Sequence, residues 1–172
     1  EWNYMTEWKI KSGEIIPYTE SADKLPAISK YYDYDEGAPG KSAQSNGITC
    51  IYRYAEVLLM YAEASTRATN TVNQDALNAI QEVQKRAGYQ DRQIELTTTT
   101  EPTAFLTAVS NERGWEFFAE MKRWFELVRL EKVKEVRAEE WDASTFNTNH
   151  HYYFPVPYQQ VDLAGWTNNA GY

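Results

Sequence analysis

The sequence predicts a mainly α-helical fold of tetratricopeptide-like helix pairs, with irregular, loop-rich flanks and few short strands. Apolar residues recur at helical spacing between about residues 51 and 134. Two of these helical stretches and their turn span roughly 35 residues, which is close to the tetratricopeptide period. A composition of 42% apolar and 24% charged residues over 172 positions is typical of a folded globular protein.

The first fifty residues predict loops with short strands. Pro17, Pro26 and Pro39, together with four glycines, break any long periodic pattern there. We therefore divide the chain into a loop-rich segment, residues 1–50, and a helical region, residues 51–172. The chain starts with neither a methionine nor a signal peptide. We accordingly expect the loop-rich segment to continue from a missing N-terminal part.

Helices are predicted near residues 51–68, 74–87, 102–120 and 122–134. The second begins after an Asn73 cap and ends at Gly88, where a left-handed residue is expected to close it. The third begins near Pro102, because proline fits the first turn. From residue 141 onward the chain is predicted to be irregular, since the FPVP run at 154–157 cannot lie inside a helix.

The composition excludes several classes of partner. A net charge of -8 argues against nucleic acid and against an anionic membrane surface. No apolar run approaches the ~20 residues that span a bilayer. Cys50 is the single cysteine, so an intrachain disulfide framework is excluded, and we expect a small buried thiol there. The high aromatic share, 15%, indicates a carbohydrate or protein partner.

Four motifs in order carry a resemblance to a known family. They are RYAEVLLMYAEA at 53–64, AIQEVQKRAG at 79–88, the pair ERGWEFFAE at 112–120 and RWFELVR at 123–129, and FPVP at 154–157 with the ending NAGY at 169–172. Together they resemble the C-terminal portion of the SusD/RagB family of outer-membrane glycan-binding lipoproteins. The chain departs from the family pattern at Gly114, Met121 and Ala170, none of which removes a functional group.

The resemblance implies a function and a location. Members of the family are non-catalytic proteins that bind starch- or polysaccharide-type glycans for nutrient uptake, together with a SusC-type TonB-dependent transporter. They are anchored by a lipid on the extracellular face of the outer membrane, through an N-terminal cysteine that this chain does not contain. The implied partners are that transporter, an oligosaccharide and the missing N-terminal part of the same protein, with no cofactor.

Charged residues in the motifs favour a structural role over catalysis. Those we single out, with one tryptophan, are Arg53, Glu56, Glu63, Glu112, Arg113, Glu116, Glu120, Arg123 and Trp124. The three glutamates at 112, 116 and 120 share one side of a helix. A glycosidase needs two carboxylates flanking a sugar in a cleft, whereas carboxylates near Arg113, Arg123 and Arg129 more often form ion pairs that join helices. We therefore predict no catalytic residue.

The histidines do not predict a metal site. His150 and His151 are the only two, and adjacent residues point apart on a strand, so they make a poor chelate. No cysteine cluster or HExxH motif accompanies them.

The aromatic residues fall into two groups, those at helical spacing and those in irregular sequence. Trp115, Trp124 and Phe125 lie at helical spacing, which predicts core or helix contacts rather than sugar platforms. Irregular sequence is where binding aromatics tend to be displayed. The candidate glycan contacts are therefore Trp2, Trp8, Tyr31, Tyr32 and Tyr34, each of which has structural contact as its alternative role.

A different class of function stays open at this point. Helix pairs of this length stack readily, so a tetratricopeptide-like protein-interaction scaffold without sugar affinity is the alternative. The FPVP run and the Gly-Tyr ending favour the glycan-binding family, because a generic repeat protein lacks them.

Overall fold

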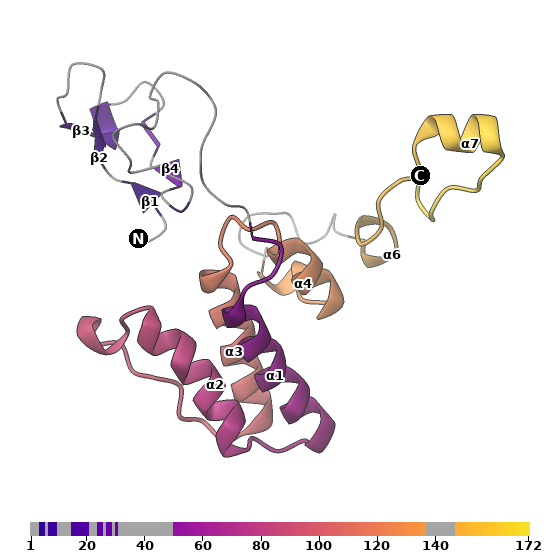
Figure 1. The fold of residues 1–172 in the computed structure, drawn as a ribbon. Coiled ribbons are helices and arrows are strands. Elements are labelled where there is room, and N and C mark those ends of the chain that lie inside the picture. Colours follow the sequence, from indigo (N-terminus) through magenta and orange to yellow (C-terminus); the bar gives the residue numbers. More distant parts are fainter. Residues whose placement is uncertain are drawn as a thin grey trace. The chain divides into compact units, whose positions relative to one another are not determined.

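A computed structural model describes residues 4, 5, 7–9, 15–20, 24, 25, 27, 28, 30, 50–136 and 147–172. The chain forms two compact units, Glu1–Met121 and Lys122–Tyr172, and each is described by itself (Figure 1). The described residues are mainly helical, with strands of two or three residues, which confirms the predicted fold class.

The strands of the first unit make two small antiparallel pairs. Strand β1 (Tyr4–Met5) pairs with β4 (Ala27–Ile28), and β2 (Glu7–Lys9) pairs with β3 (Ile15–Pro17), which precedes a 3-10 turn, η1 (Tyr18–Glu20). Short strands were expected among the first fifty residues. The predicted exposed loop at 33–47 lies outside the described residues.

Helix α1 (Tyr54–Thr69) begins directly after Arg53 and ends at Asn70, which has a left-handed φ of 50°. Asparagine tolerates this conformation better than most residues, so it closes the helix in place of glycine. The helix buries Leu59 and Ala62 toward the core.

Helix α2 (Gln74–Arg86) has the predicted caps at both ends. The side chain of Asn73 accepts a hydrogen bond from the Ala76 backbone N–H at 2.8 Å, which satisfies a donor of the first turn. Gly88 follows the helix with a φ of +76°, and its N–H donates to the Lys85 carbonyl at 2.9 Å. The predicted helix–turn–helix unit is therefore confirmed.

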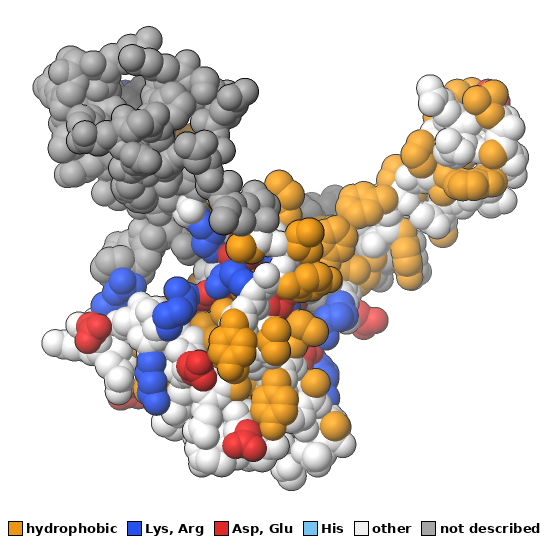
Figure 2. Space-filling model, in the orientation of Figure 1, with side chains coloured by type: hydrophobic (Ala, Val, Ile, Leu, Met, Phe, Trp, Pro, Cys, Tyr) orange, Lys and Arg blue, Asp and Glu red, His pale blue; other side chains and the backbone are white. Residues whose placement is uncertain are grey.

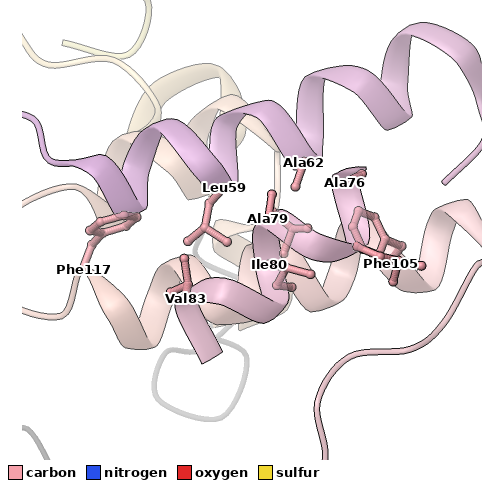
Figure 3. Close-up of a cluster of buried hydrophobic side chains, with 10 residues drawn as sticks. Leu59, Ala62, Ala76, Ala79, Ile80, Val83, Phe105 and Phe117 are labelled. Atoms are coloured by element: carbon pink, nitrogen blue, oxygen red, sulfur yellow. The ribbon is translucent and has the colours of Figure 1, made fainter. Parts of the chain in front are cut away.

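Helix α3 (Pro102–Glu116) lies against both helices of this pair and completes the core (Figures 1 and 3). Glu101 caps it by accepting from the N–H groups of Thr103 and Ala104, at 3.0 and 2.6 Å. The core consists of Leu59, Ala62, Ala76, Leu77, Ala79, Ile80, Val83, Phe105, Val109 and Phe117. Small alanines from α1 and α2 lie beside one another in it, so the two helices can approach closely.

The third helix ends four residues earlier than predicted. After Glu116 the chain forms turns instead, and Ala119 and Met121 have left-handed φ values of 63° and 59°. The break near Met121 was expected, but its beginning at Phe117 was not.

The described residues of the second unit form four short helices. These are α4 (Arg123–Arg129), α5 (Val133–Val136), α6 (Thr148–His151) and α7 (Tyr158–Ala164). The prediction of one helix over 122–134 is wrong, because Glu131 has a left-handed φ of 56° between α4 and α5. This break lets Leu127 and Val133 meet in one small apolar cluster, with Trp124, Val128 and Tyr152 against it.

The C-terminal segment is more regular than predicted. Residues after 141 were expected to be irregular, but α6 and α7 lie there, while residues 137–146 are outside the described part. The FPVP run is extended as expected, and Pro157 precedes α7. Asn168 accepts from the Val156 N–H at 2.8 Å, and the Asn169 amide donates to the Phe154 carbonyl at 2.6 Å. These bonds satisfy backbone groups that lie beside and between the two prolines.

Two further findings concern the surface. No helix among the described residues is both long enough and apolar enough to cross a membrane. Cys50 is exposed, so the expectation of a buried thiol is wrong. The apolar helical pattern that suggested burial begins only at Tyr54, and Cys50 precedes that helix.

Candidate functional site

Several polar residues of the motifs, together with Lys30, meet where α1 begins and α3 ends. We call this the charge cluster; it comprises Lys30, Arg53, Arg86, Glu112, Glu116 and Glu120. Three cations and three carboxylates are thus gathered in a protein with a net charge of -8. Because the formal charges balance, the cluster itself carries no strong field toward a charged ligand.

Arg53 is the centre of the charge cluster. Its NH1 donates to Glu116 Oε1, and its Nε and NH2 donate to Glu120 Oε1 at 3.1 and 2.8 Å. Its guanidinium also lies over the Phe117 ring, 4.7 Å from the centroid. Burial disfavours the cation, but the hydrogen bonds that Arg53 donates to both carboxylates outweigh burial and hold the pKa of Arg53 above its ordinary value. Arg53 therefore stays charged and joins the start of α1 to the end of α3.

Lys30 closes the C-terminal end of α3. Its ammonium donates to the carbonyls of Glu116 and Phe118 at 2.7 and 3.1 Å, and to Glu120 Oε1 at 2.8 Å. Carbonyls at a helix end lack intrahelical partners, and the helix dipole favours a cation there. This contact gives the break after Glu116 a physical reason, because Lys30 satisfies the carbonyls that a longer helix would use.

Glu116 also bridges to α2. Arg86 NH2 lies 2.6 Å from each of its carboxylate oxygens. The side chain of Glu116 is only 6% exposed, whereas that of Arg86 is 64% exposed. Glu116 thus contacts cations from the ends of two different helices.

Glu112 is held by neutral donors. Tyr89 OH donates to its Oε2 at 2.8 Å, and Gln84 Nε2 donates to the same oxygen at 3.1 Å. Gln84 in turn accepts from the Thr97 backbone N–H at 2.9 Å. Burial raises the pKa of Glu112 although these donors oppose it, and burial together with the bond to Glu112 raises the pKa of Tyr89. The group fixes the segment between α2 and α3 against both helices.

The turn after α2 brings Tyr89 to this position. The Gly88 N–H bonds to the Lys85 carbonyl, and the Tyr89 N–H bonds to the Gln84 carbonyl at 3.2 Å, which is a complete Schellman motif. A side chain at Gly88 would be strained at its φ of +76°. The glycine of the second motif is therefore needed for the Tyr89–Glu112 bond.

The arrangement favours a structural role over hydrolysis. Two carboxylates acting on a glycosidic bond must face a sugar across a cleft. Glu116 and Glu120 instead bind the same guanidinium of Arg53, and Glu112 is 1% exposed and hydrogen-bonded to two side chains. Their geometry stabilises the contact between helices.

Other motif residues make ion pairs elsewhere. Glu56 of α1 lies 3.8 Å from Arg113 of α3, and both side chains are buried. Glu63 pairs with Arg67 one turn further along α1 at 2.8 Å. In the second unit Arg123 pairs with Glu126 at 3.3 Å.

Sequence reasoning anticipated ion pairs for the three glutamates but named Arg113, Arg123 and Arg129 as their cations. Glu116 and Glu120 contact Arg53, Arg86 and Lys30 instead, and Arg53 and Lys30 are more than sixty positions away from Glu120. Glu112 accepts from the neutral side chains of Tyr89 and Gln84. Arg86 lies in the last turn of α2, three residues after Val83, which was the available signal for a cation at that helix end. No local signal pointed to Tyr89 or Gln84.

The aromatic residues of the third motif differ in how exposed their side chains are. Trp115 is 59% exposed and Phe125 is 65% exposed, so neither is a core residue, which corrects the expectation of core contacts for both. Trp124 is partly buried against Leu127 and Val133, with the Phe154 ring 6.5 Å away. Trp115 precedes the turn at 117–121 and lies outside the face of α3 that buries Phe105, Val109 and Glu112.

The candidate glycan contacts mostly lie outside the described residues. This holds for Trp2, Tyr31, Tyr32 and Tyr34. Trp8 lies in β2, where its backbone is opposite Ile16 of β3.

His150 and His151 lie on α6 and not on a strand. Their rings stack with centroids 4.5 Å apart, and the Asn147 N–H donates to His151 Nδ1 at 2.9 Å. Tyr172 meets the His150 ring edge-on at 4.1 Å. Within the described ranges no group of three His, Cys, Asp or Glu side chains is arranged to hold a metal ion.

These features define a class of protein: a tetratricopeptide-like helical scaffold stabilised by a partly buried network of charges. Residues 2–172 match the model of the SusD family, so the chain belongs to that family.

Individual relatives agree with this assignment. The chain is 29% identical to SusD-like protein P2 of Formosa agariphila, over 94% of this chain and 34% of the relative. It is 27% identical to SusD-like protein P25 of the same organism, over 81% of this chain and 26% of the relative. The chain thus spans about a third or less of the length of these curated relatives.

Solved structures give the same result. The fold is similar to that of a SusD superfamily protein from Parabacteroides distasonis, with a TM-score of 0.73 and 26% identity over 99% of this chain and 37% of that one. It is also similar to a SusD homolog from Bacteroides thetaiotaomicron, with a TM-score of 0.61 and 29% identity over 71% of this chain and 26% of that one.

Proposed function

We propose that this chain is the C-terminal scaffold of a non-catalytic protein that binds glycans of the starch or polysaccharide type for nutrient uptake. The protein works with a SusC-type TonB-dependent transporter on the extracellular face of the outer membrane, where a lipid on an N-terminal cysteine outside this chain anchors it. The observation that carries the proposal is the SusD family match over residues 2–172.

The charge cluster supports the scaffold role. Its carboxylates bind Arg53, Arg86 and Lys30, so they hold helix ends together and are not presented to a sugar. We place the glycan contacts in the loop-rich segment, residues 1–50, at Trp2, Trp8, Tyr31, Tyr32 and Tyr34. The helical region, residues 51–172, supports them, together with the N-terminal part of the protein that the relatives' greater length indicates.

Calorimetric titration of a glycan panel against the full-length protein tests the proposal. Shallow stacking sites remove little area from water, so we expect dissociation constants on the order of micromolar to millimolar. Replacing both Trp2 and Trp8 by alanine should weaken binding, whereas Trp115→Ala, an exposed tryptophan on α3, is the matched control. Binding by wild type that both variants retain would contradict our placement of the site.

A reducing-end assay tests the non-catalytic part. We expect no release of reducing sugar by the full-length protein. Turnover that Glu116→Gln abolishes would show that the carboxylates of the charge cluster act on substrate.

A further inference from the structure

The segment around α7 forms a small closed loop in the second unit. The Val156 N–H donates to Asn168 Oδ1 at 2.8 Å, and the Asn169 amide donates to the Phe154 carbonyl at 2.6 Å, so the two ends of the segment lie side by side. Gly165 ends α7 with a left-handed φ of 68° and turns the chain back (Figure 1). We call residues 157–167 the closed loop. Compact surface loops whose ends are close together are frequently functional.

The closed loop presents its large side chains to solvent. Tyr158 is 78% exposed, Leu163 is 84% exposed and Trp166 is 57% exposed. No residue of α7 itself is buried. Figure 2 shows orange side chains over this part of the surface and no blue of Lys or Arg. Large apolar and aromatic side chains displayed together by a loop with fixed ends indicate a contact surface.

The charge of the closed loop restricts what can bind there. The chain as a whole has 24% charged residues, but Asp162 is the only one at positions 157–167. Lys and Arg are the residues that bind the carboxylate, sulfate or phosphate groups of an acidic ligand, and the sequence from 147 to 172 contains neither. A ligand of the closed loop is therefore expected to be uncharged.

Amide side chains complete the chemistry of the closed loop. Gln159 and Gln160 directly follow Tyr158, and both are exposed. A carboxamide donates and accepts hydrogen bonds, as a sugar hydroxyl does. Tyrosine and tryptophan offer rigid, flat faces at a low cost in side-chain entropy, and the C–H face of a sugar ring suits such faces. Aromatic faces beside uncharged amides are the combination that recognises a neutral oligosaccharide.

We propose that the closed loop is a second glycan-contact surface, which binds a neutral oligosaccharide on Tyr158 and Trp166 with hydrogen bonds from Gln159 and Gln160. The inference rests on the proposed function for the class of ligand. It adds a site in the other unit of the chain from residues 1–50, and it specifies that the sugar carries no charge. A loop this small suits a sugar better than a protein, because stable protein interfaces bury about 800 Å² on each partner.

Fluorine NMR of the full-length protein, labelled with 5-fluorotryptophan, tests the proposal at Trp166 itself. The Trp166 signal is assigned by its disappearance in Trp166→Phe. Maltoheptaose, cellohexaose, xylohexaose and mannohexaose are the neutral probes. At least one of them should shift the signal saturably, with a dissociation constant on the order of micromolar to millimolar. The signal of Trp115, an exposed tryptophan of the first unit, is the control and should not move.

Substitutions in the closed loop separate its contacts. Tyr158→Ala should raise the dissociation constant measured at Trp166 by at least about tenfold, because one of two stacking faces is lost. Replacing both Gln159 and Gln160 by alanine should raise it by about threefold or more, because their hydrogen bonds to the sugar are lost. Leu163→Ala removes an exposed apolar side chain without an aromatic face, so it should leave the constant within about twofold of wild type. All these side chains are exposed, so urea unfolding should have the same midpoint in every variant.

Several results would overturn the proposal. A Trp166 signal that does not move in about 10 mM of any neutral probe, or that moves equally in Tyr158→Ala and the glutamine variant, shows that the closed loop binds no sugar. A shift that only an oligogalacturonide produces shows an acidic ligand. A signal that a soluble nitroxide fails to broaden shows that another segment or a second copy covers the loop.

Calorimetric titration of the same probes scores the proposed function separately. Binding heat without any shift at Trp166 would refute the closed loop as a site and leave the proposed function in place. A shift at Trp166 whose dissociation constant is unchanged when both Trp2 and Trp8 are replaced by alanine would support two independent surfaces.

Discussion

Glu116→Gln should destabilise the first unit, because Glu116 is the carboxylate that contacts both Arg53 and Arg86. The substitution keeps the volume and one acceptor oxygen but removes the charge. Two guanidinium groups then lose a charged partner, while Arg53 retains its bonds to Glu120 at 2.8 and 3.1 Å. The perturbation is therefore electrostatic and leaves the apolar core unchanged.

The size of the effect follows from the exposure of each partner. Breaking a buried ion pair costs about 3–5 kcal/mol, because a charge is left without a partner. Arg86 is 64% exposed, so solvent screens its pair and its contribution is at most about 1 kcal/mol. The side chain of Arg53 is far less exposed, and a hydrogen bond to a charged group contributes about 1.5–3 kcal/mol. Since Arg53 keeps Glu120, we expect a total loss of about 2 kcal/mol in the free energy of unfolding.

Urea unfolding followed by far-UV circular dichroism measures this loss. The matched control is Glu82→Gln, the same change at an exposed position of α2, which should stay within about 0.5 kcal/mol of wild type. In about 1 M salt the part due to Arg86 should shrink, because the screening length falls to about 3 Å. A loss below about 0.5 kcal/mol for Glu116→Gln would refute the view that the charge cluster stabilises the helices.

Three further substitutions probe the other contacts. Burial of Glu120 is outweighed by its hydrogen-bonding cations, which hold the pKa of Glu120 below its ordinary value. Glu120→Gln should therefore lower the free energy of unfolding at pH 7, and its difference from wild type should shrink below about pH 4.5 in a series of urea unfoldings. A difference in unfolding free energy that stays constant with pH would contradict this. A Cβ on Gly171 would lie 2.7 Å from the His150 side chain, whereas a Cβ on Gly165 meets no atom within 4 Å. Gly171→Ala should therefore speed amide hydrogen exchange near the C-terminus far more than Gly165→Ala. Equal exchange rates in the two variants would show that the clash with His150 adds nothing to the backbone strain. Trp124→Ala should cost less than the about 3–5 kcal/mol of a fully buried tryptophan, because Trp124 is only partly buried; a full-sized loss measured by urea unfolding would place it in a core.

Local chemistry made much of the helical region predictable. Asn73 provides the cap of α2, Gly88 adopts the left-handed conformation after it, and Pro102 opens α3. Each of these signals acts within a few residues and needs no tertiary contact. The corresponding helices therefore begin or end close to the predicted positions.

The end of α3 could not be predicted in the same way. Phe117, Phe118 and Ala119 continue a helical pattern, and nothing nearby in sequence stops it. The helix ends where Lys30 and Arg53 bind the Glu116 carbonyl, at 2.7 Å each. Lys30 is 86 positions away in sequence, so the cause of the break lies in tertiary structure.

The candidate site was predictable in kind but not in its partners. Three glutamates at a spacing of four residues predict ion pairs along one helix side. Which cations reach them depends on how α1, α2 and residue 30 meet α3, and single-sequence patterns carry no such information. Trp115 and Phe125 show the same limit, because the face of a helix that other elements cover is set by tertiary contacts.

The charge cluster explains why the motifs are informative about the fold and not about a ligand. Arg53 comes from the first motif, Arg86 from the second, and Glu112, Glu116 and Glu120 from the third, yet they meet in one place. Each of these three motifs supplies a group that binds a group of another, so together they specify how three helices meet. Groups that bind one another in this way leave few donors or acceptors for a sugar. This is the reason that we propose the glycan contacts in the loop-rich segment, whose sequence lies outside these motifs.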